Sequence, residues 1–202
     1  REEVLRRHVS VSTESLQTLR ISDVLNDVAP VSLLHELLFP LGFNSSQIRD
    51  IHRCMTVPQS GKRFRSKEWE VVRDREELLI QKTGIEESLP ELRVEEVERT
   101  DGFVIPKDKH IACLDADKVR HPLSLRKWRM GDKFVPFGMT GQKKVSDYLT
   151  DKKFSILEKE RQWVACSGED IVWLVNERTD NRFRVTEKTA RVLKMQVIES
   201  KK

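Results

Sequence analysis

Lysine pairs and glycines gather in one short stretch of this chain, PFGMTGQKKVSDYLTDKKF, at positions 136–154. The stretch holds two glycines and two lysine pairs: Gly138, Gly141, Lys143, Lys144, Lys152 and Lys153. Ser146 is a good N-cap, so a short helix is predicted to start there, with the first lysine pair just before it. Lysines at a helix N-terminus repel the helix dipole. A loop with glycines, free backbone N–H groups and ammonium groups together predict that a phosphate binds at this end.

The basic residues continue upstream of that stretch. From position 120 to position 153 the chain has nine Lys and Arg against three Asp, a net charge of +6. In a strand, Arg126 and Trp128 would point to one face, and Lys127 and Arg129 to the other. This density favours phosphate binding over an ordinary solvated face. An edge strand whose basic residues protect it from aggregation has the same pattern, so both interpretations stay open here.

Other chemistry finds little support in the sequence. GxSxG, HExxH, Walker and GxGxxG motifs are all absent. His35 and His52 fall within helical patterns and are interpreted as structural. Asp115 and Asp117 could share a metal, but a turn is favoured because no further carboxylates accompany them. The three cysteines form no CxxC, which predicts neither a zinc site nor a disulfide framework, and a reduced cytoplasmic location.

Charge is distributed unevenly along the chain. Positions 1–118 hold 18 Lys and Arg against 22 Asp and Glu, a net charge of −4, whereas positions 119–202 hold 19 against 11, a net charge of +8. This asymmetry predicts a polyanion partner for the C-terminal part. No apolar run approaches the length of a membrane span, and no signal peptide opens the chain. Because the chain begins with Arg1, it is interpreted as a fragment or a processed product.

The elements expected to position these residues fall into two parts. Positions 1–10, REEVLRRHVS, resemble the tail of a helix. In PVSLLHELLFPLGF, helical spacing of five apolar residues predicts a helix that Pro40 and Gly42 end; the five are Val31, Leu34, Leu37, Leu38 and Leu41. Asn44 or Ser45 is predicted to cap a second helix, SSQIRDIHRCM. The alternation in FRSKEWEVVRDREELLIQ then predicts a β-hairpin.

An acidic, linker-like segment, GIEESLPE, marks the expected domain boundary. Seven later segments read as strands: LRVEEV, HIACLDA, LSLRKWR, RQWVACSG, DIVWLV, FRVT and VLKMQVIE. A single short helix is predicted within VSDYLTDKK. The expected fold class is therefore α+β. A small, mainly helical domain with a β-hairpin (residues 1–84) precedes a strand-rich α+β domain with one short helix (residues 85–202).

The segment LSLRKWRMGDKFVPFGMTGQKKVSDYLTDKKF resembles the C-terminal domain of the tRNA(Ile)-lysidine synthetases. The matching residues are Arg126, Arg129, Gly131, Asp132, Pro136, Gly138, Lys143, Lys144, Asp147, Asp151 and Lys153. The later IVWLVNERTDNRFRVTEKT resembles the end of that domain through Trp173, Arg178 and Arg182. Asn176 stands where many relatives have glycine. ELLFPLGFNSSQI and SGKRFRSKEWEVVRDREELLI resemble the family's middle domain, so the resemblance covers nearly the whole chain.

The resemblance implies the tRNA-gripping region of an ATP-dependent ligase. Members of the family attach lysine to the cytidine at the first anticodon position of a minor isoleucine tRNA, after adenylating that cytidine with ATP. The chemistry belongs to an N-terminal ATP-pyrophosphatase-type domain with an SGGxDS loop, which this sequence lacks. No catalytic residue, metal or cofactor is therefore expected in this chain. ATP, Mg²⁺ and L-lysine are implied for the full-length, cytoplasmic enzyme.

By resemblance, the C-terminal domain would hold the acceptor-stem side of isoleucine tRNA, and the middle domain would support tRNA placement. Ten residues are predicted to bind tRNA: Arg126, Lys127, Arg129, Lys133, Lys143, Lys144, Lys152, Lys153, Arg178 and Arg182. The enzyme's own N-terminal catalytic domain is a second expected partner. In an alternative interpretation, the region forms a homodimer or docks the catalytic domain, and its basic face meets acidic protein such as the acidic first half. An independent hydrolase is disfavoured because no motif supports one.

Overall fold

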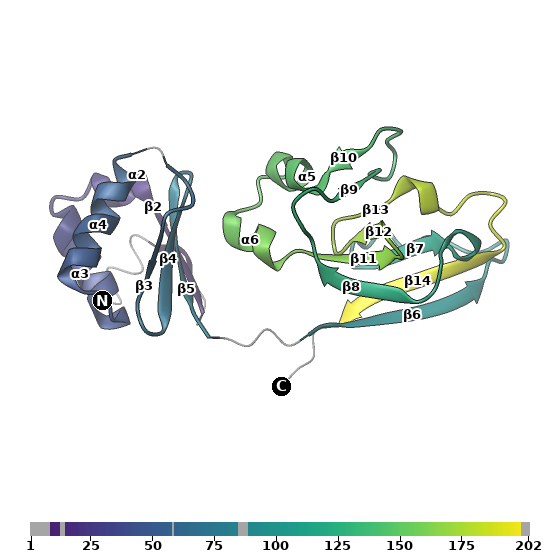
Figure 1. Cartoon of the computed structure of the whole chain (residues 1–202), viewed down its shortest axis with the longest axis horizontal. Coiled ribbons are helices and arrows are strands. Elements are labelled where there is room, and N and C mark those ends of the chain that lie inside the picture. The colour runs from purple at the N-terminus through teal and green to yellow at the C-terminus, as the bar shows by residue number, and fades with distance from the viewer. Residues whose placement is uncertain (1–8, 13–14, 58, 85–88, 199–202) are drawn as a thin grey trace. The chain divides into compact units, whose positions relative to one another are not determined.

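The computed structural model describes residues 9–12, 15–57, 59–84 and 89–198. The chain divides into two units, Arg1–Glu86 and Glu87–Lys202 (Figure 1). Among the described helices, none is long and apolar enough to cross a membrane. The helix expected at positions 1–10 lies mostly outside the described residues, and its last two positions belong to a strand.

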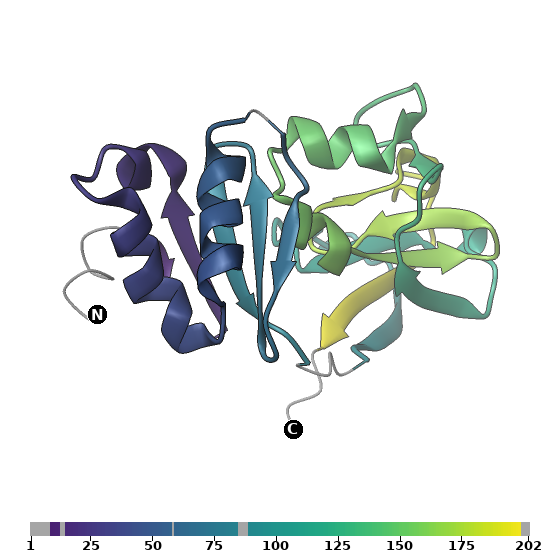
Figure 2. The same cartoon turned by 60° about the vertical axis from the view of Figure 1, so that its left-hand side comes forward.

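The first unit is built on an antiparallel sheet with the strand order β1-β2-β5-β4-β3, and its helices cover one face of that sheet (Figure 1, Figure 2). The strands are β1 (Val9–Ser12), β2 (Leu16–Arg20), β3 (Arg63–Arg65), β4 (Trp69–Asp74) and β5 (Glu77–Lys82). The helices are α2 (Ile21–Leu25), α3 (Pro30–Leu38), the 3₁₀ turn η1 (Phe39–Leu41) and α4 (Ser45–Met55). The prediction of a mainly helical unit is thus wrong. The predicted hairpin is real, as β4 and β5, but it forms part of a five-stranded sheet.

The ends of the helices follow local chemistry. Pro30 stands at the start of α3, where its missing N–H costs nothing. Gly42 ends η1 with φ +86°, a left-handed conformation that glycine adopts without steric cost. Asn44 caps α4 as predicted: the Gln47 N–H donates to its side chain at 2.9 Å, and the Asn44 N–H donates to the Gln47 side chain at 3.0 Å.

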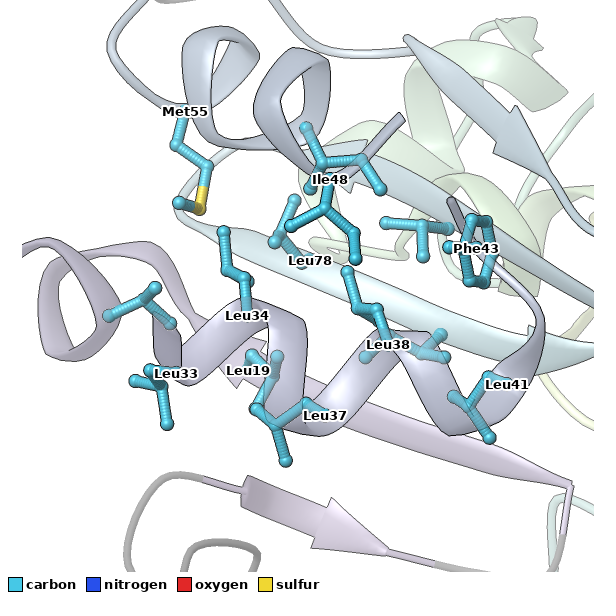
Figure 3. Close-up of a cluster of buried hydrophobic side chains, with 14 of the residues drawn as sticks. Leu19, Leu33, Leu34, Leu37, Leu38, Leu41, Phe43, Ile48, Met55 and Leu78 are labelled. Carbon is cyan, nitrogen blue, oxygen red and sulfur yellow. The ribbon is translucent and has the colours of Figure 1, made fainter. Parts of the chain in front are cut away.

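The apolar stripe of α3 forms the centre of the first unit's core. Figure 3 shows leucines of α3 beside Ile48 of α4 and Leu78 of β5. Four of the five residues predicted for this stripe are buried, namely Leu34, Leu37, Leu38 and Leu41. Val31 is 40% exposed, so its assignment was wrong. The buried stripe includes Leu33 instead and therefore leaves Val31 at its margin.

A buried carboxylate belongs to β4. Glu70 is 2% exposed and accepts hydrogen bonds from Arg63 at 3.0 Å, Arg65 at 2.8 Å and Gln81 at 3.0 Å. Burial alone would raise the pKa of Glu70, but the hydrogen bonds from Arg65 and Gln81 and the arginine charges outweigh it, so the pKa lies below its ordinary value. A carboxylate with a lowered folded-state pKa stabilises the fold above its unfolded pKa. That contribution is lost as the pH falls through the folded-state pKa.

We expect the first unit to lose stability as the pH falls below about 4.3, the ordinary glutamate pKa. Glu70→Gln should be less stable at neutral pH, because Arg63 and Arg65 lose the buried carboxylate that holds them, and should lack this part of the acid dependence. Denaturant midpoints of both proteins, measured across this pH range, provide the check. Parallel pH profiles would show that Glu70 is not the titrating group.

The second unit stacks two sheets and a helical layer (Figure 1). One sheet has the order β6-β14-β7, from β6 (Glu91–Glu98), β14 (Arg191–Ile198) and β7 (Ile111–Asp115). The other has the order β13-β12-β11-β8, from β13 (Arg178–Thr179), β12 (Asp170–Leu174), β11 (Trp163–Ser167) and β8 (Leu123–Lys127). A two-stranded hairpin and two helices complete the unit: β9 (Lys133–Phe134), β10 (Lys143–Lys144), α5 (Val145–Asp151) and α6 (Ile156–Arg161). Short 3₁₀ turns are η2 (Ala116–Lys118) and η3 (Asn181–Phe183).

Two details of the second unit differ from the sequence predictions. Its described residues form two α-helices, not one, because Ser155 and Glu158 form a capping box that starts α6. The segment FRVT is not a strand: Phe183 ends η3, in which the Arg182 N–H donates to the Asp180 side chain at 2.8 Å. β8 lies at the edge of its sheet, which is the position that the alternative interpretation of its basic residues required.

The sheet that contains β11 is buried on both faces. Ala165 packs toward the β6-β14-β7 sheet, with residues such as Leu114 and Met195. Its neighbours Val164 and Cys166 belong to a second cluster, with side chains of α5. This alternation follows the pleat of the strand. It gives α5 and the β9–β10 hairpin a rigid support.

Asn176 lies in the short turn between β12 and β13, with φ +60°. Asparagine enters this left-handed region more readily than most residues. Within the described residues, its side-chain oxygen is buried without a hydrogen-bond partner. The turn therefore uses the backbone conformation of Asn176 rather than an Oδ1 contact, so glycine could take the same position.

Replacing Asn176 should separate backbone from side-chain effects. We expect Asn176→Gly to change the free energy of unfolding of the second unit by less than about 0.5 kcal/mol, and Asn176→Ala to lower it by about 1 kcal/mol. Urea denaturation followed by tryptophan fluorescence measures both. A larger loss for glycine than for alanine would contradict the backbone explanation.

Candidate nucleic-acid interface

The β9–β10 hairpin places two lysines opposite each other. Lys133 and Lys144 are register partners, and both are exposed. The other residue of β9, Phe134, is fully buried and meets the Tyr148 ring edge-on at 5.4 Å between centroids. Since side chains alternate along a strand, anchoring Phe134 in the core turns Lys133 outward. Directly opposed like charges destabilise a strand pair, and no carboxylate of the described residues pairs with either lysine.

An ion pair beneath the hairpin fixes its start. Asp132 accepts two hydrogen bonds from the Arg126 guanidinium, at 2.8 and 3.0 Å, and a third from the Arg129 N–H at 2.7 Å. Burial would raise the pKa of Asp132, but these donors outweigh it and hold the pKa below its ordinary range. The hydrogen bond to Asp132 raises the pKa of Arg126. Arg126 therefore holds the fold together here, and the Asp132 carboxylate occupies its donors and offsets its positive charge.

Helix α5 begins earlier than predicted. Its N-cap is Lys144, not Ser146, and no side chain caps it. The Val145 side chain is fully buried and its N–H donates to the Asp132 carbonyl at 2.9 Å, so packing sets the start of the helix. The Lys143 ammonium lies 2.5 Å from the carboxylate of Asp151, the last residue of α5. The two lysines of the first pair therefore differ, since Lys143 has a carboxylate partner.

The ten predicted tRNA-binding residues fall into distinct environments. Three pair with carboxylates: Arg126, Lys143 and Arg182. Two lie over aromatic rings, Lys127 at 4.5 Å from the Trp163 centroid and Lys152 at 5.9 Å from the Tyr148 centroid. Lys153 has φ +61° at the end of α5, a position where glycine is usual. The exposed remainder comprises Arg129, Lys133, Lys144 and Arg178, and no carboxylate hydrogen bond to their side chains is found in the described ranges.

A second buried carboxylate ties the hairpin to the turn η3. Asp180 is 0% exposed. It accepts hydrogen bonds from the Val135 N–H at 2.9 Å and from the Arg182 guanidinium at 2.9 and 3.0 Å. The hydrogen bonds from Arg182 to Asp180 are the largest cause that raises the pKa of Arg182. Arg182 also reaches Asp170 at 2.8 Å, so its position is fixed from two sides.

Next to Asp180, Asn181 fixes the loop that joins β9 to β10. Its side-chain oxygen accepts from the Gly138 N–H at 3.1 Å, and its side-chain nitrogen donates to the Met139 carbonyl at 2.9 Å. The same oxygen accepts from Arg184 at 3.2 Å. Sequence reasoning missed Arg184 as a neighbour of this site. Its spacing of two residues from Arg182 was the available signal.

Asp115 and Asp117 form a turn, as favoured from the sequence. The Asp115 carboxylate accepts from the Asp117 N–H at 3.2 Å and from the Thr189 hydroxyl at 2.8 Å. Asp117 pairs with Arg191. Within the ranges that the structure covers, no group of three or more His, Cys, Asp or Glu side chains could hold a metal ion. The three cysteines are free and buried, and burial raises the pKa of each thiol.

Dividing the chain at the observed boundary, after Glu86, gives net charges that differ from those found by dividing it at position 118. The first unit has 13 Lys and Arg and 13 Asp and Glu, a net charge of 0; the second has 24 against 20, a net charge of +4. The acidic surplus before position 118 belongs to the second unit, where Glu96 of β6 pairs with Arg191 of β14 at 2.8 Å. The first unit is therefore not the acidic partner that the alternative interpretation supposed.

Comparison with known proteins decides the family. The family "TilS substrate binding domain" matches residues 12–83. A tRNA(Ile)-lysidine synthase of Bacteroides thetaiotaomicron is 53% identical over 183 residues, which cover 89% of this chain and 43% of that protein. The chain belongs to the tRNA(Ile)-lysidine synthase family. This result confirms the resemblance described above.

A second tRNA(Ile)-lysidine synthase, from Parabacteroides distasonis, is 43% identical over 205 residues, covering 95% of this chain and 46% of that protein. The chain thus spans less than half the length of these two synthases, and it corresponds to their C-terminal region. Among solved structures, a crystal structure of the TilS C-terminal domain aligns with a TM-score of 0.47 and 20% identity, covering 55% of this chain and 85% of that one.

Proposed function

We propose that this chain is the tRNA-binding, non-catalytic part of a tRNA(Ile)-lysidine synthase. The full-length enzyme would ligate lysine to the first anticodon cytidine of a minor isoleucine tRNA, and its N-terminal domain would carry the chemistry with ATP, Mg²⁺ and L-lysine. The second unit binds phosphates on the acceptor-stem side of the tRNA. The first unit supports tRNA placement.

The opposed lysines of the β9–β10 hairpin carry this proposal. Lys133 and Lys144 repel each other in the ladder, and a phosphate between them would turn that repulsion into attraction. Arg129 extends the same cationic surface, because the turn closed by the Asp132 N–H to the Arg129 carbonyl, at 3.1 Å, leads directly into β9. Duplex RNA is recognised mainly through shape and backbone contacts, which suits cations on a rigid hairpin.

The remaining predicted residues take two roles in this proposal. Arg126 and Arg182 act as positioning residues, because their carboxylate partners hold β9 and η3 in place. Lys127, Lys143, Lys152, Lys153 and Arg178 add to the positive field around the hairpin. Such a field raises the association rate and depends strongly on ionic strength.

Salt dependence tests the proposal directly. With about three phosphate contacts, from Lys133, Lys144 and Arg129, the affinity for isoleucine tRNA should fall by roughly 40-fold between about 50 and 200 mM salt. Fluorescence anisotropy with labelled tRNA measures the slope. Affinity that is independent of salt, or absence of tRNA binding at low salt, would refute phosphate binding by this chain.

A further inference from the structure

Two exposed apolar side chains stand on the loop that joins the lysine-bearing strands. Phe137 is 47% exposed and Met139 is 46% exposed. Both lie between β9 and β10, whose Lys133 and Lys144 carry the proposed phosphate contact. Neither residue belongs to the clusters of buried hydrophobic side chains that form the cores of the described units.

The backbone under these side chains is held in place. The Phe137 N–H donates to the Thr179 carbonyl at 2.9 Å, and the Gly138 N–H donates to the Asn181 side chain at 3.1 Å. The Asn181 side chain in turn donates to the Met139 carbonyl at 2.9 Å. A ligand that contacts Phe137 and Met139 would therefore meet a preformed backbone, which reduces the entropy cost of binding.

The surroundings of the two side chains favour a nucleotide over an apolar protein surface. The Arg184 guanidinium reaches the same Asn181 oxygen, at 3.2 Å, and so lies beside the loop. Arg184 is exposed, and no carboxylate hydrogen bond to it is found among the described residues. An exposed ring on this loop and a guanidinium held by the same asparagine can offer a base a stacking face and its phosphate a counter-charge. Methionine adds a polarizable, adaptable contact.

Paired bases cannot use such a surface. Inside an RNA duplex each base is stacked on its neighbours, and the major groove is too narrow for side chains to enter. Only an unpaired base, or one at the end of the duplex, presents a free face. The ligand that fits an exposed ring beside a duplex-binding hairpin is therefore a single-stranded nucleotide that adjoins a duplex.

We propose that Phe137 and Met139 form a stacking platform for unpaired nucleotides next to an RNA duplex. Arg184 binds the phosphate of those nucleotides. This inference rests on the proposed function, because Lys133 and Lys144 of the same hairpin hold the duplex. It adds a structural preference to that function: a junction between paired and unpaired RNA binds better than a blunt duplex.

Anisotropy titrations of the full chain with two RNAs test this preference. One RNA is a blunt duplex, and the other is the same duplex with a short unpaired extension, placed at either end of one strand in turn. We expect one extended form to bind about tenfold more tightly than the blunt form. Phe137→Ala with Met139→Ala should abolish that difference and leave blunt-duplex affinity within about twofold, since stacking makes no contact there.

Matched variants separate this inference from the proposed function. Met130→Ala removes another exposed methionine, 84% exposed in the turn before β9, and should keep the preference. Phe137→Trp should keep it too, because the ring face is retained. Lys133→Gln with Lys144→Gln should lower the affinity for both RNAs by the same factor.

The other outcomes are also decisive. Equal affinity of the unaltered chain for blunt and extended RNAs overturns the stacking platform and leaves the duplex-binding proposal standing. If neither RNA binds, both proposals fail. Self-association that the Phe137→Ala, Met139→Ala double variant abolishes, with no preference among RNAs, would show that the loop docks protein.

Discussion

Lys133→Glu combined with Lys144→Glu is expected to lower the affinity of this chain for isoleucine tRNA by on the order of 100-fold at low salt. The variant removes the two proposed phosphate contacts and puts two carboxylates in their place. The slope of log affinity against log salt should also become shallower by about 2, since roughly one counterion is released per contact. Anisotropy titrations at several salt concentrations measure both quantities.

A control with the same change in net charge is available within the second unit. Lys107 and Lys188 are exposed and lie in the loops before β7 and β14. Lys107→Glu with Lys188→Glu should cost much less affinity, because only the long-range field changes. Equal losses in the two double variants would mean that overall charge, and not the hairpin, determines binding.

Asp180→Ala is expected to destabilise the second unit by about 3 kcal/mol. The substitution leaves the Val135 N–H without its acceptor in a buried site and removes the main partner of Arg182. Urea denaturation followed by tryptophan fluorescence measures the loss. Amide exchange at Val135 provides a local readout and should accelerate strongly.

Asp170→Ala is the matched control for this prediction. Asp170 is the second carboxylate that pairs with Arg182, and its side chain is 54% exposed. The substitution should therefore lower the free energy of unfolding by less than about 1 kcal/mol. Arg182 would keep its bond to Asp180. If both variants were equally destabilised, the buried position of Asp180 would have no special importance.

Local signals in the sequence predicted several elements of the fold. The Asn44 cap predicted α4, and the leucine stripe predicted α3. The alternation around Val71 predicted β4 and β5. The five-stranded sheet escaped prediction because it depends on pairing β2 with β5, which is distant in the sequence. β2 supplies only one residue, Leu19, to the hydrophobic core, so its amphipathic pattern is weak.

The candidate interface could be predicted from the sequence as a cationic region, but the role of each residue in it could not. The charge density around the β9–β10 hairpin was visible in the sequence. The roles depend on which cations find carboxylates, and those partners are set by tertiary structure. Arg182 of η3 pairs with Asp170 of β12, and Lys143 of β10 pairs with Asp151 at the end of α5. Lys144, in contrast, lies opposite Lys133. Adjacent lysines in the sequence thus occupy chemically different positions.

The contacts of Asp180 and Asn181 have a geometric consequence. Asp180 bonds to Val135, one residue from the end of β9, and Asn181 bonds to the loop at Gly138 and Met139. The strand that carries Lys133 and the loop that carries Phe137 and Met139 are therefore both held by the turn η3. The separation between the lysine and these two apolar side chains is thus constant. Two ligand groups that bind at these points must match that separation. The hairpin would then select ligands by the spacing of these two groups as well as by their negative charge.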